Sequence, residues 1–425
     1  MKCSILVVTA ALGSSILAMA NAETVPAPEA LVVDGVPAVP AELRSATAPY
    51  MESRTATFVG WNPQSKGILI TTRFGNTNQV HEVAAPSGSR EQKTFEREPV
   101  GAVGYAPGKG DVLVLSKDVG GDEFYQLYTL ESGRLRLLTD GKSRNTSAMW
   151  NHEGTQLGYS STRRNGTDSD LYLIDPRDPK SNRLVAQVQG GGWSFADFAP
   201  NGARALVINA VSVNQQELYQ LELSTGKMTR LGSKKAGVVY GTASYGPDGT
   251  IYATSDEGSE FLRLGAINPK TSAFEPFALA GAQPWDVEDF QVAADNSFLA
   301  YVVNEAGISR LRLLEPSTRR ALGEASLPSG VVSSLKIAPW GAIGFTLSSS
   351  QSPSDAYSVD AKTLAVTRWT RSETGGLDAS RNANAELVRT KSFDGLEVSG
   401  FLYRPDATRF PGKRPLILVI HGGPE

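Results

Sequence analysis

"SAMWNHEGTQLGYSSTRRNGTDSDLYLIDP", residues Ser147–Pro176, contains three short apolar segments separated by polar turns. The segments SAMW, LGYSS and DLYLID carry alternating apolar positions, and a fourth segment, RLVAQ, follows at Arg183–Gln187. Short alternating runs bounded by turn residues are typical of antiparallel β-strands. This part of the chain therefore predicts a unit of four short strands.

The same pattern recurs along the chain. An apolar or aromatic residue, two small or polar residues and a Gly-, Asn- or Asp-rich turn open each repeat, at Trp61, Tyr105, Trp150, Phe198, Tyr245, Val292 and Ile337. Successive repeats are 44, 45, 48, 47, 47 and 45 residues apart, and a second anchor lies roughly 20 residues into each. Four strands at this period are typical of one blade of a β-propeller.

We therefore expect an all-β fold, a seven-bladed β-propeller over residues 51–370. A stack of unrelated sandwich domains would not keep so even a period. Before the blades, residues 23–50 carry prolines at positions 26, 28, 37, 40 and 49, which predict an extended arm. After the blades, residues 371–386 have few large apolar side chains and a glycine pair, which predict a linker.

The first 22 residues predict a secretory signal peptide. Lys2 provides the positive charge, Ser4–Ala18 the apolar segment, and Ala20-Asn21-Ala22 a cleavage site with small residues. The apolar segment is shorter than the roughly 20 residues that span a bilayer. We expect an exported protein, periplasmic or secreted, with no membrane span after cleavage. The single cysteine, Cys3, lies in this segment, so the mature chain has no disulfide.

The composition is that of a soluble globular protein. The 425 residues are 40% hydrophobic and carry a formal net charge of −3. This charge provides no basic excess, and we expect no nucleic-acid partner. The sequence leaves the oligomeric state open.

The pattern changes after Leu387. Residues Leu387–Pro405 alternate on both sides of Asp394-Gly395, a dipeptide that favours tight hairpin turns, and so predict a β-hairpin. The segment PLILVI, Pro415–Ile420, has no alternation, which is typical of a strand covered on both faces in a parallel sheet. His-Gly-Gly-Pro follows directly, and a glycine pair there leaves backbone N–H groups free to point at a ligand.

These residues resemble the prolyl oligopeptidase family of serine peptidases, especially its acylaminoacyl-peptidase and dipeptidyl-aminopeptidase-like members. SFDGLEVSGFLYRP followed by PLILVIHGGPE is similar to the start of the family's α/β-hydrolase domain, and blade segments such as DVGGDEFYQLYTLE are similar to its propeller. The resemblance covers nearly all of the mature chain. It implies that residues 387–425 are the truncated N-terminal part of the peptidase domain, and that the complete enzyme hydrolyses short peptides through an acyl-enzyme.

The resemblance also implies a role for the HGGP loop. It places the backbone N–H of Gly423 in the oxyanion hole, with His421, Gly422 and Pro424 shaping the loop. No Gly-x-Ser-x-Gly nucleophile motif follows Gly423 in the 425 residues, so the catalytic nucleophile, acid and base are expected to be missing. Without them an oxyanion loop does not cleave an amide, and the chain alone is expected to be inactive.

Two other functions remain open. A non-catalytic, TolB-like periplasmic propeller would bind a partner and need no triad. A propeller enzyme such as a lactonase would need metal-binding residues that converge on the axis. Of the three histidines, His81 and His152 occupy different positions in their blades and have no metal-ligand spacing, so we expect no metal and no cofactor.

Two further groups of residues are candidates for binding. Asp286, Glu288 and Asp289 are close enough in sequence to bind a free amino group, although three acids before a strand are more often a solvated turn. Arg163 and Arg164 in STRRNGTDSD would suit a peptide carboxylate, although a charge-balanced loop is the simpler interpretation. The anchors Trp61 and Trp150 are expected to lie in the core.

Overall fold

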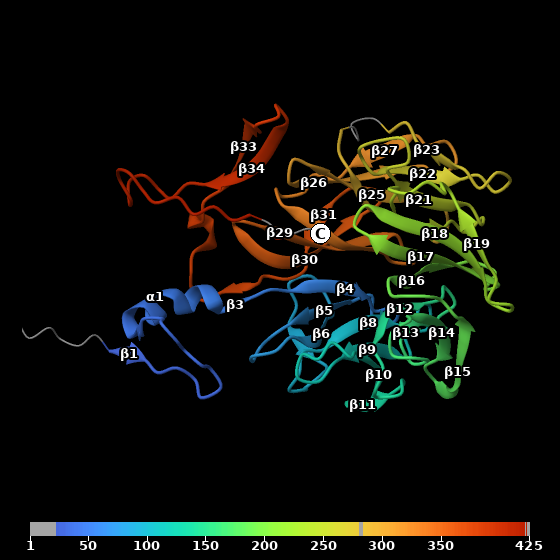
Figure 1. Ribbon diagram of the computed structural model, residues 1–425, viewed down its shortest axis with the longest axis horizontal. Coiled ribbons are helices and arrows are strands. Elements are labelled where there is room, and N and C mark those ends of the chain that lie inside the picture. The colour runs from blue at the N-terminus through green and yellow to red at the C-terminus, as the bar shows by residue number, and fades with distance from the viewer. Residues whose placement is uncertain (1–22, 280–283, 421, 423–425) are drawn as a thin grey trace, which may run out of the picture.

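The computed structural model describes residues 23–279, 284–420 and 422. Seven four-stranded antiparallel sheets follow one another along the chain, and each is built from four consecutive strands in sequence order. Neighbouring sheets contact each other mainly through their first strands, and the first strand of the first sheet contacts strands of the last. The sheets therefore form a closed ring, the predicted seven-bladed propeller (Figure 1).

The first four blades occupy the N-terminal half of the ring. Their strands are β4 (Thr57–Trp61), β5 (Ile68–Thr72), β6 (Gln79–Val83) and β7 (Arg90–Gln92); β8 (Gly101–Tyr105), β9 (Leu113–Lys117), β10 (Gln126–Glu131) and β11 (Arg134–Leu137); β12 (Asn145–Trp150), β13 (Leu157–Ser161), β14 (Asp170–Asp175) and β15 (Asp178–Ala186); β16 (Trp193–Phe198), β17 (Arg204–Ser212), β18 (Gln215–Glu222) and β19 (Met228–Leu231).

The last three blades complete the ring. Their strands are β20 (Tyr240–Tyr245), β21 (Ile251–Ser255), β22 (Arg263–Ile267) and β23 (Phe274–Pro276); β24 (Val287–Val292), β25 (Leu299–Glu305), β26 (Ile308–Leu314) and β27 (Ala321–Glu324); β28 (Val331–Ile337), β29 (Ala342–Ser349), β30 (Ser352–Asp360) and β31 (Val366–Arg368). Each predicted unit corresponds to one blade.

The elements outside the blades are few. They are β1 (Thr24–Val25), β2 (Val39–Pro40), α1 (Ala41–Met51) and β3 (Ser53–Arg54) before the ring, and β32 (Glu373–Thr374), the short 3-10 helix Ala379–Arg381, β33 (Ala385–Lys391) and β34 (Glu397–Tyr403) after it.

The core lies between adjacent blades. Phe195 and Phe198 on β16 stack with ring centroids 5.3 Å apart and press against Gly158 on β13 of the preceding blade. A Cβ at Gly158 would lie 2.8 Å from the Phe198 ring, so this position accepts only glycine without movement of its neighbours. Burial of both sheet faces explains why the second strands contain short runs of consecutive apolar residues, such as ILI in β5, LVL in β9 and LAYVV in β25.

The first strand of all seven blades contains a β-bulge. A bulge adds a residue on one strand, increases the local twist and redirects the following side chain. Three charged residues directly follow such a bulge, Asp197 on β16, Asp289 on β24 and Lys336 on β28. The bulges therefore place charged groups on the strands that surround the axis.

Blade 7 meets blade 1 without sharing a strand. The amide of Phe58 on β4 donates to Thr346 Oγ1 on β29 at 2.8 Å, and the amide of Ala56 donates to the carbonyl of Ser354 at 2.8 Å. Trp61 packs edge-on against Trp340 and Trp369 of blade 7. Side chains and single hydrogen bonds, instead of a strand ladder, thus close the ring.

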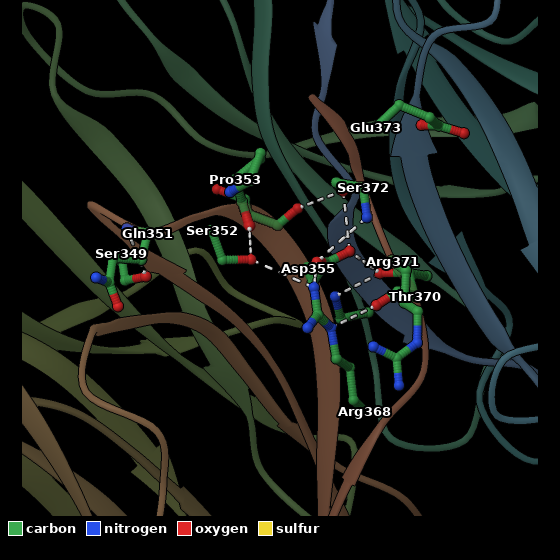
Figure 2. A network of polar contacts seen from close by, with 12 residues as sticks. Ser349, Gln351, Ser352, Pro353, Asp355, Arg368, Thr370, Arg371, Ser372 and Glu373 are labelled. Atoms are coloured by element: carbon green, nitrogen blue, oxygen red, sulfur yellow. Dashed lines mark hydrogen bonds and ion pairs between the residues drawn. The ribbon is translucent and has the colours of Figure 1, made fainter. Parts of the chain in front are cut away.

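A buried carboxylate secures the end of blade 7 at this junction (Figure 2). Asp355 on β30 is fully buried and accepts hydrogen bonds from Arg368 Nη2 at 2.5 Å, Thr370 Oγ1 at 2.6 Å and Ser372 Oγ at 2.9 Å. The carboxylate thereby holds the segment that follows β31 against the adjacent strand β30. A charged acceptor with several donors in the interior is the geometry in which burial of a charge is tolerated.

The segments on either side of the propeller pair with each other. β3 and β32 form a two-stranded sheet, with Ser53 opposite Thr374 and Arg54 opposite Glu373. Arg90 of blade 1 adds an ion pair to Glu373 at 3.2 Å and donates to the carbonyl of Arg371 at 2.8 Å. The chain consequently enters and leaves the ring at one place and on the same face.

The arm over residues 23–50 differs from the expected extended segment. Residues Ala41–Met51 form α1, none of whose side chains is buried. The prolines led to the prediction of an extended arm, but most of them precede residue 41. The segment AELRSATA is rich in residues that favour a helix, and it forms the first part of α1. Among the described residues, no helix is both long and apolar enough to cross a membrane.

The C-terminal hairpin forms as expected, whereas the strand after it does not. β33 and β34 pair around Asp394-Gly395, where Gly395 has φ 87°. The predicted strand Pro415–Ile420 has no regular structure, and Leu416–Ile420 are 75–88% exposed. A parallel-sheet strand needs hydrogen-bonding neighbours, and no described segment provides one. The expected start of a hydrolase sheet is therefore absent from the described structure.

Replacement of Phe58 with alanine tests the junction between blades 7 and 1. Phe58 is 1% exposed and packs on Gly344 of β29, so we expect Phe58→Ala to lower the free energy of unfolding by about 3–5 kcal/mol. The matched control is Phe95→Ala at a side chain that is 76% exposed, with an expected change within about 0.5 kcal/mol. Equal effects in urea unfolding would contradict the packing described.

Candidate functional site

The predicted oxyanion loop lies mostly outside the described residues. His421, Gly423 and Pro424 are not among them, and the predicted roles of these three residues stay predictions. Gly422 is described, is exposed, and has no atom near enough to contact an added Cβ. The geometry of a candidate site therefore comes from the propeller.

One face of the propeller carries most of its exposed apolar side chains. This face is the one from which both flanking segments leave, and it holds the loops between the second and third strands and between successive blades. The exposed apolar residues on these loops are Phe74, Phe95, Val119, Phe124 and Val213, and exposed Val211 lies near the end of β17. Phe401 of the C-terminal hairpin lies against Gly307, in the turn between β25 and β26 on the same face. Exposed apolar residues that share one face are a candidate contact surface.

A cavity of about 270 Å³ opens at the junction between blades 1 and 7. It is lined by Phe74, Ser87, Gly88, Arg90, Trp369, Thr370, Arg371 and Glu373. The Arg90 side chain is only 9% exposed, forms an ion pair with Glu373 and donates a hydrogen bond to the Arg371 carbonyl. The charged groups here primarily hold the junction together.

Asp197 links three consecutive blades. Its carboxylate accepts from His152 Nε2 of blade 3 at 3.0 Å, and from Ser244 Oγ and the Tyr245 amide of blade 5 at 2.7 Å each. The hydrogen bond to Asp197 raises the pKa of His152 above its ordinary value. The three side chains do not form a catalytic triad, because the carboxylate and not the imidazole contacts the serine hydroxyl.

The acidic residues of WDVEDF do not act as one patch. Asp286 Oδ1 accepts from the Leu262 amide at 2.7 Å, and Glu288 accepts from Asn304 Nδ2 at 2.9 Å. Asp289 is different, because burial raises its pKa to about 6. The three acids therefore have three separate environments.

The loop STRRNGTDSD is charge-balanced. Arg164 forms ion pairs with Asp168 at 2.8 Å and with the fully buried Asp170 at 2.6 Å. Arg163 lies with its guanidinium 6.0 Å from the ring centroid of Tyr172. These contacts occupy both arginines and favour the structural interpretation over a carboxylate site.

His81 is a buried histidine with one free nitrogen. Its Nδ1 donates to the carbonyl of Gln79 at 3.0 Å, because a carbonyl only accepts, whereas Nε2 is buried and has no partner among the described residues. Phe74 packs edge-on against the ring at 4.7 Å. Burial lowers the pKa of His81, so the ring is neutral at pH 7. No group of three or more potential metal ligands occurs among the described residues.

Comparison with known proteins gives a structural match and no sequence match. No protein-family model matches the sequence, and neither does any curated protein. A solved prolyl endopeptidase superposes with a TM-score of 0.68 at 14% identity over 85% of this chain. The chain therefore shares its propeller fold with this solved protein. Puromycin hydrolase gives the same TM-score and identity, and prolyl oligopeptidase B from Galerina marginata gives 0.63 at 13%.

The shared fold accounts for only part of these solved proteins. The chain spans 56%, 60% and 57% of the prolyl endopeptidase, puromycin hydrolase and oligopeptidase B chains, respectively. At this level of identity the likeness is one of fold. The expected seven-bladed propeller is confirmed, whereas the site residues of the HGGP loop remain a prediction.

Two charged positions in the propeller were not found from the sequence. Lys336 directly precedes the apolar anchor Ile337 in a predicted strand. A charged residue at this place is unusual, and it was the sequence feature that could have identified Lys336. Asp355 precedes the second anchor of its unit, but nothing in the sequence distinguished it from an exposed acid. The partners that make each residue important come from other strands.

The two propeller histidines are expected to give opposite pH dependences. The lowered pKa of His81 means that its contribution to stability is present above its ordinary value of 6.5 and is lost as pH falls below it. The raised pKa of His152 means that its contribution is present below 6.5 and is lost as pH rises through its folded pKa.

Substitution tests this assignment by urea unfolding from pH 5 to pH 8. We expect His81→Leu to reduce the fall in the free energy of unfolding as the pH drops below 6.5. We expect His152→Gln to lower the free energy of unfolding below pH 6.5, where His152 stabilises the unchanged chain. The opposite assignment of the two slopes, or no change in either variant, would show that these histidines do not control the profile.

Proposed function

We propose that this chain is the propeller-bearing N-terminal portion of an exported serine peptidase of the prolyl oligopeptidase family. The observation that carries the proposal is the likeness of the propeller to that of prolyl endopeptidases over 85% of this chain. The β33–β34 hairpin and the sequence LILVIHGGP that follow the ring support it. The substrate class proposed is short peptides.

The chemistry of the complete enzyme would be acyl transfer. A serine from a hydrolase domain would attack the scissile carbonyl, and a histidine would act as base and then as acid. The backbone N–H of Gly423 would donate to the oxyanion of the tetrahedral intermediate, a kind of contact whose loss costs about 10²–10³-fold in kcat. The 425 residues hold no Gly-x-Ser-x-Gly, so we propose that this chain alone does not hydrolyse peptides.

The apolar face of the propeller supports a position for the hydrolase domain. The hairpin emerges on this face, and Phe401 already rests on the turn at Gly307. A domain that follows the hairpin would cover Phe74, Phe95 and Phe124, which are 44%, 76% and 48% exposed without it. Covering this face would restrict access to the site and favour small substrates.

The residues before the ring support export. Lys2 and the apolar run Ser4–Ala18 precede the small residues Ala20-Asn21-Ala22, the pattern of a cleaved secretory signal. We propose that the mature protein starts at Glu23 and acts in the periplasm or outside the cell.

A fluorophosphonate probe tests the proposed function. We expect the 425-residue chain to remain unlabelled, because it has no activated serine. A gene product that extends beyond codon 425 through a Gly-x-Ser-x-Gly motif, with Asp and His after it in that order, is expected to be labelled.

A purified serine hydrolase labelled in the same reaction is the control for the probe. Labelling of the 425-residue chain would contradict its proposed inactivity. Absence of the motif from every reading frame after codon 425 would contradict the peptidase proposal and leave a binding propeller in its place.

A further inference from the structure

Two opposite charges lie unpaired on adjacent inner strands of the propeller. Lys336 is on β28 and Asp289 is on β24, and each directly follows a β-bulge. No described residue forms an ion pair or a side-chain hydrogen bond with the Lys336 ammonium. Among the described residues, the Asp289 carboxylate accepts only the amide of Phe290, at 2.8 Å.

Lys336 is an exposed residue on β28, the first strand of blade 7. The residue is exposed, yet desolvation by surrounding protein lowers the pKa of its ammonium. Both observations hold together if the side chain projects into the central channel that propellers enclose. A Cβ at Gly60 on β4 would lie 3.9 Å from Lys336 Cδ, so the side chain leans toward blade 1, and the glycine leaves it room.

The two charges interact without touching. Asp289 is the one charged group that raises the pKa of Lys336, and Lys336 in turn opposes the rise in the pKa of Asp289. They form no ion pair with each other, and Lys336 Cδ lies near Gly60 of blade 1. Two desolvated charges without partners are costly unless a third group bridges them.

We propose that Lys336 and Asp289 form a channel site for a small zwitterion, a free amino acid or a short peptide. The carboxylate of the ligand would pair with the Lys336 ammonium, and its amino group with Asp289. This site is separate from the peptidase site proposed above, and it requires no residue beyond the propeller.

The backbone around the site is held in place independently of a ligand. Trp61 Nε1 donates to the carbonyl of Lys336 at 3.2 Å, and Asn304 Nδ2 holds the neighbouring Glu288. The two charged side chains therefore start from a rigid frame, which lowers the cost of ordering them on binding.

Isothermal titration with glycylglycine tests the proposal, with acetate and methylamine as probes that carry one charge each. We expect glycylglycine to bind at least tenfold more tightly than either single-charge probe. Lys336→Met and Asp289→Asn are each expected to weaken glycylglycine binding by at least tenfold. Both variants are expected to fold, since neither charge forms an ion pair with a described residue, and a far-UV circular dichroism spectrum like that of the unchanged chain checks this.

The matched controls are Lys270→Met and Asp34→Asn, which remove exposed charges elsewhere and are expected to bind glycylglycine like the unchanged chain. The proposal would be overturned if the unchanged chain did not bind glycylglycine, or if both channel variants bound it as tightly as the unchanged chain. Loss of binding in Lys336→Met alone would also overturn it, because the site would then recognise a carboxylate and not a zwitterion. Alanine in place of glycylglycine distinguishes a free amino acid from a peptide as the preferred ligand.

Discussion

The junction between blade 7 and blade 1 is the constraint on which the rest of the structure depends. Every blade takes all four of its strands from one continuous segment, so no strand of one end of the ring completes a sheet at the other. The ring is closed by the Phe58–Thr346 hydrogen bond, the tryptophans around Trp61, and the short β3–β32 pair. Each of these contacts is individually modest, and they act together.

The buried Asp355 gives this junction its polar centre. It orients Arg368, Thr370 and Ser372 in the segment that leaves the ring, and this segment then pairs with the one that enters. The same contacts place both flanking segments on one face, next to the exposed phenylalanines. Ring closure and the position of any following domain therefore have a common structural cause.

The fold was largely predictable because each blade of a propeller repeats the same residue pattern at a regular spacing in the sequence. Anchors such as Trp150 and Phe198 recur at even spacing, and the turn at Asp394-Gly395 has a local cause, so both predictions are confirmed. α1 was missed because the count of prolines outweighed the helix-forming residues after Pro40.

The candidate sites were less predictable because they depend on contacts between blades. β-Bulges shift the strand register, so periodicity does not tell which side chain of β28 faces the channel, and Lys336 was missed. For LILVI, the apolar composition predicted a strand, but strand formation needs partners that the described chain does not contain. The oxyanion loop around Gly423 is known only from its resemblance to a family motif.

Hydrogen–deuterium exchange measured by mass spectrometry, on the unchanged chain and on Asp355→Ala, tests the central claim most directly. If the junction closes the ring, peptides from β4, β29 and β30 in the unchanged chain will be as protected as those from β16 and β17. The substitution will then accelerate exchange first in β4 and β29–β31, with β16 and β17 least affected. The account would be contradicted if the peptides from β4 and β29–β31 exchanged at the same high rate in the unchanged chain and in Asp355→Ala. The junction would then be open in both chains, and Asp355 would not contribute to closing it.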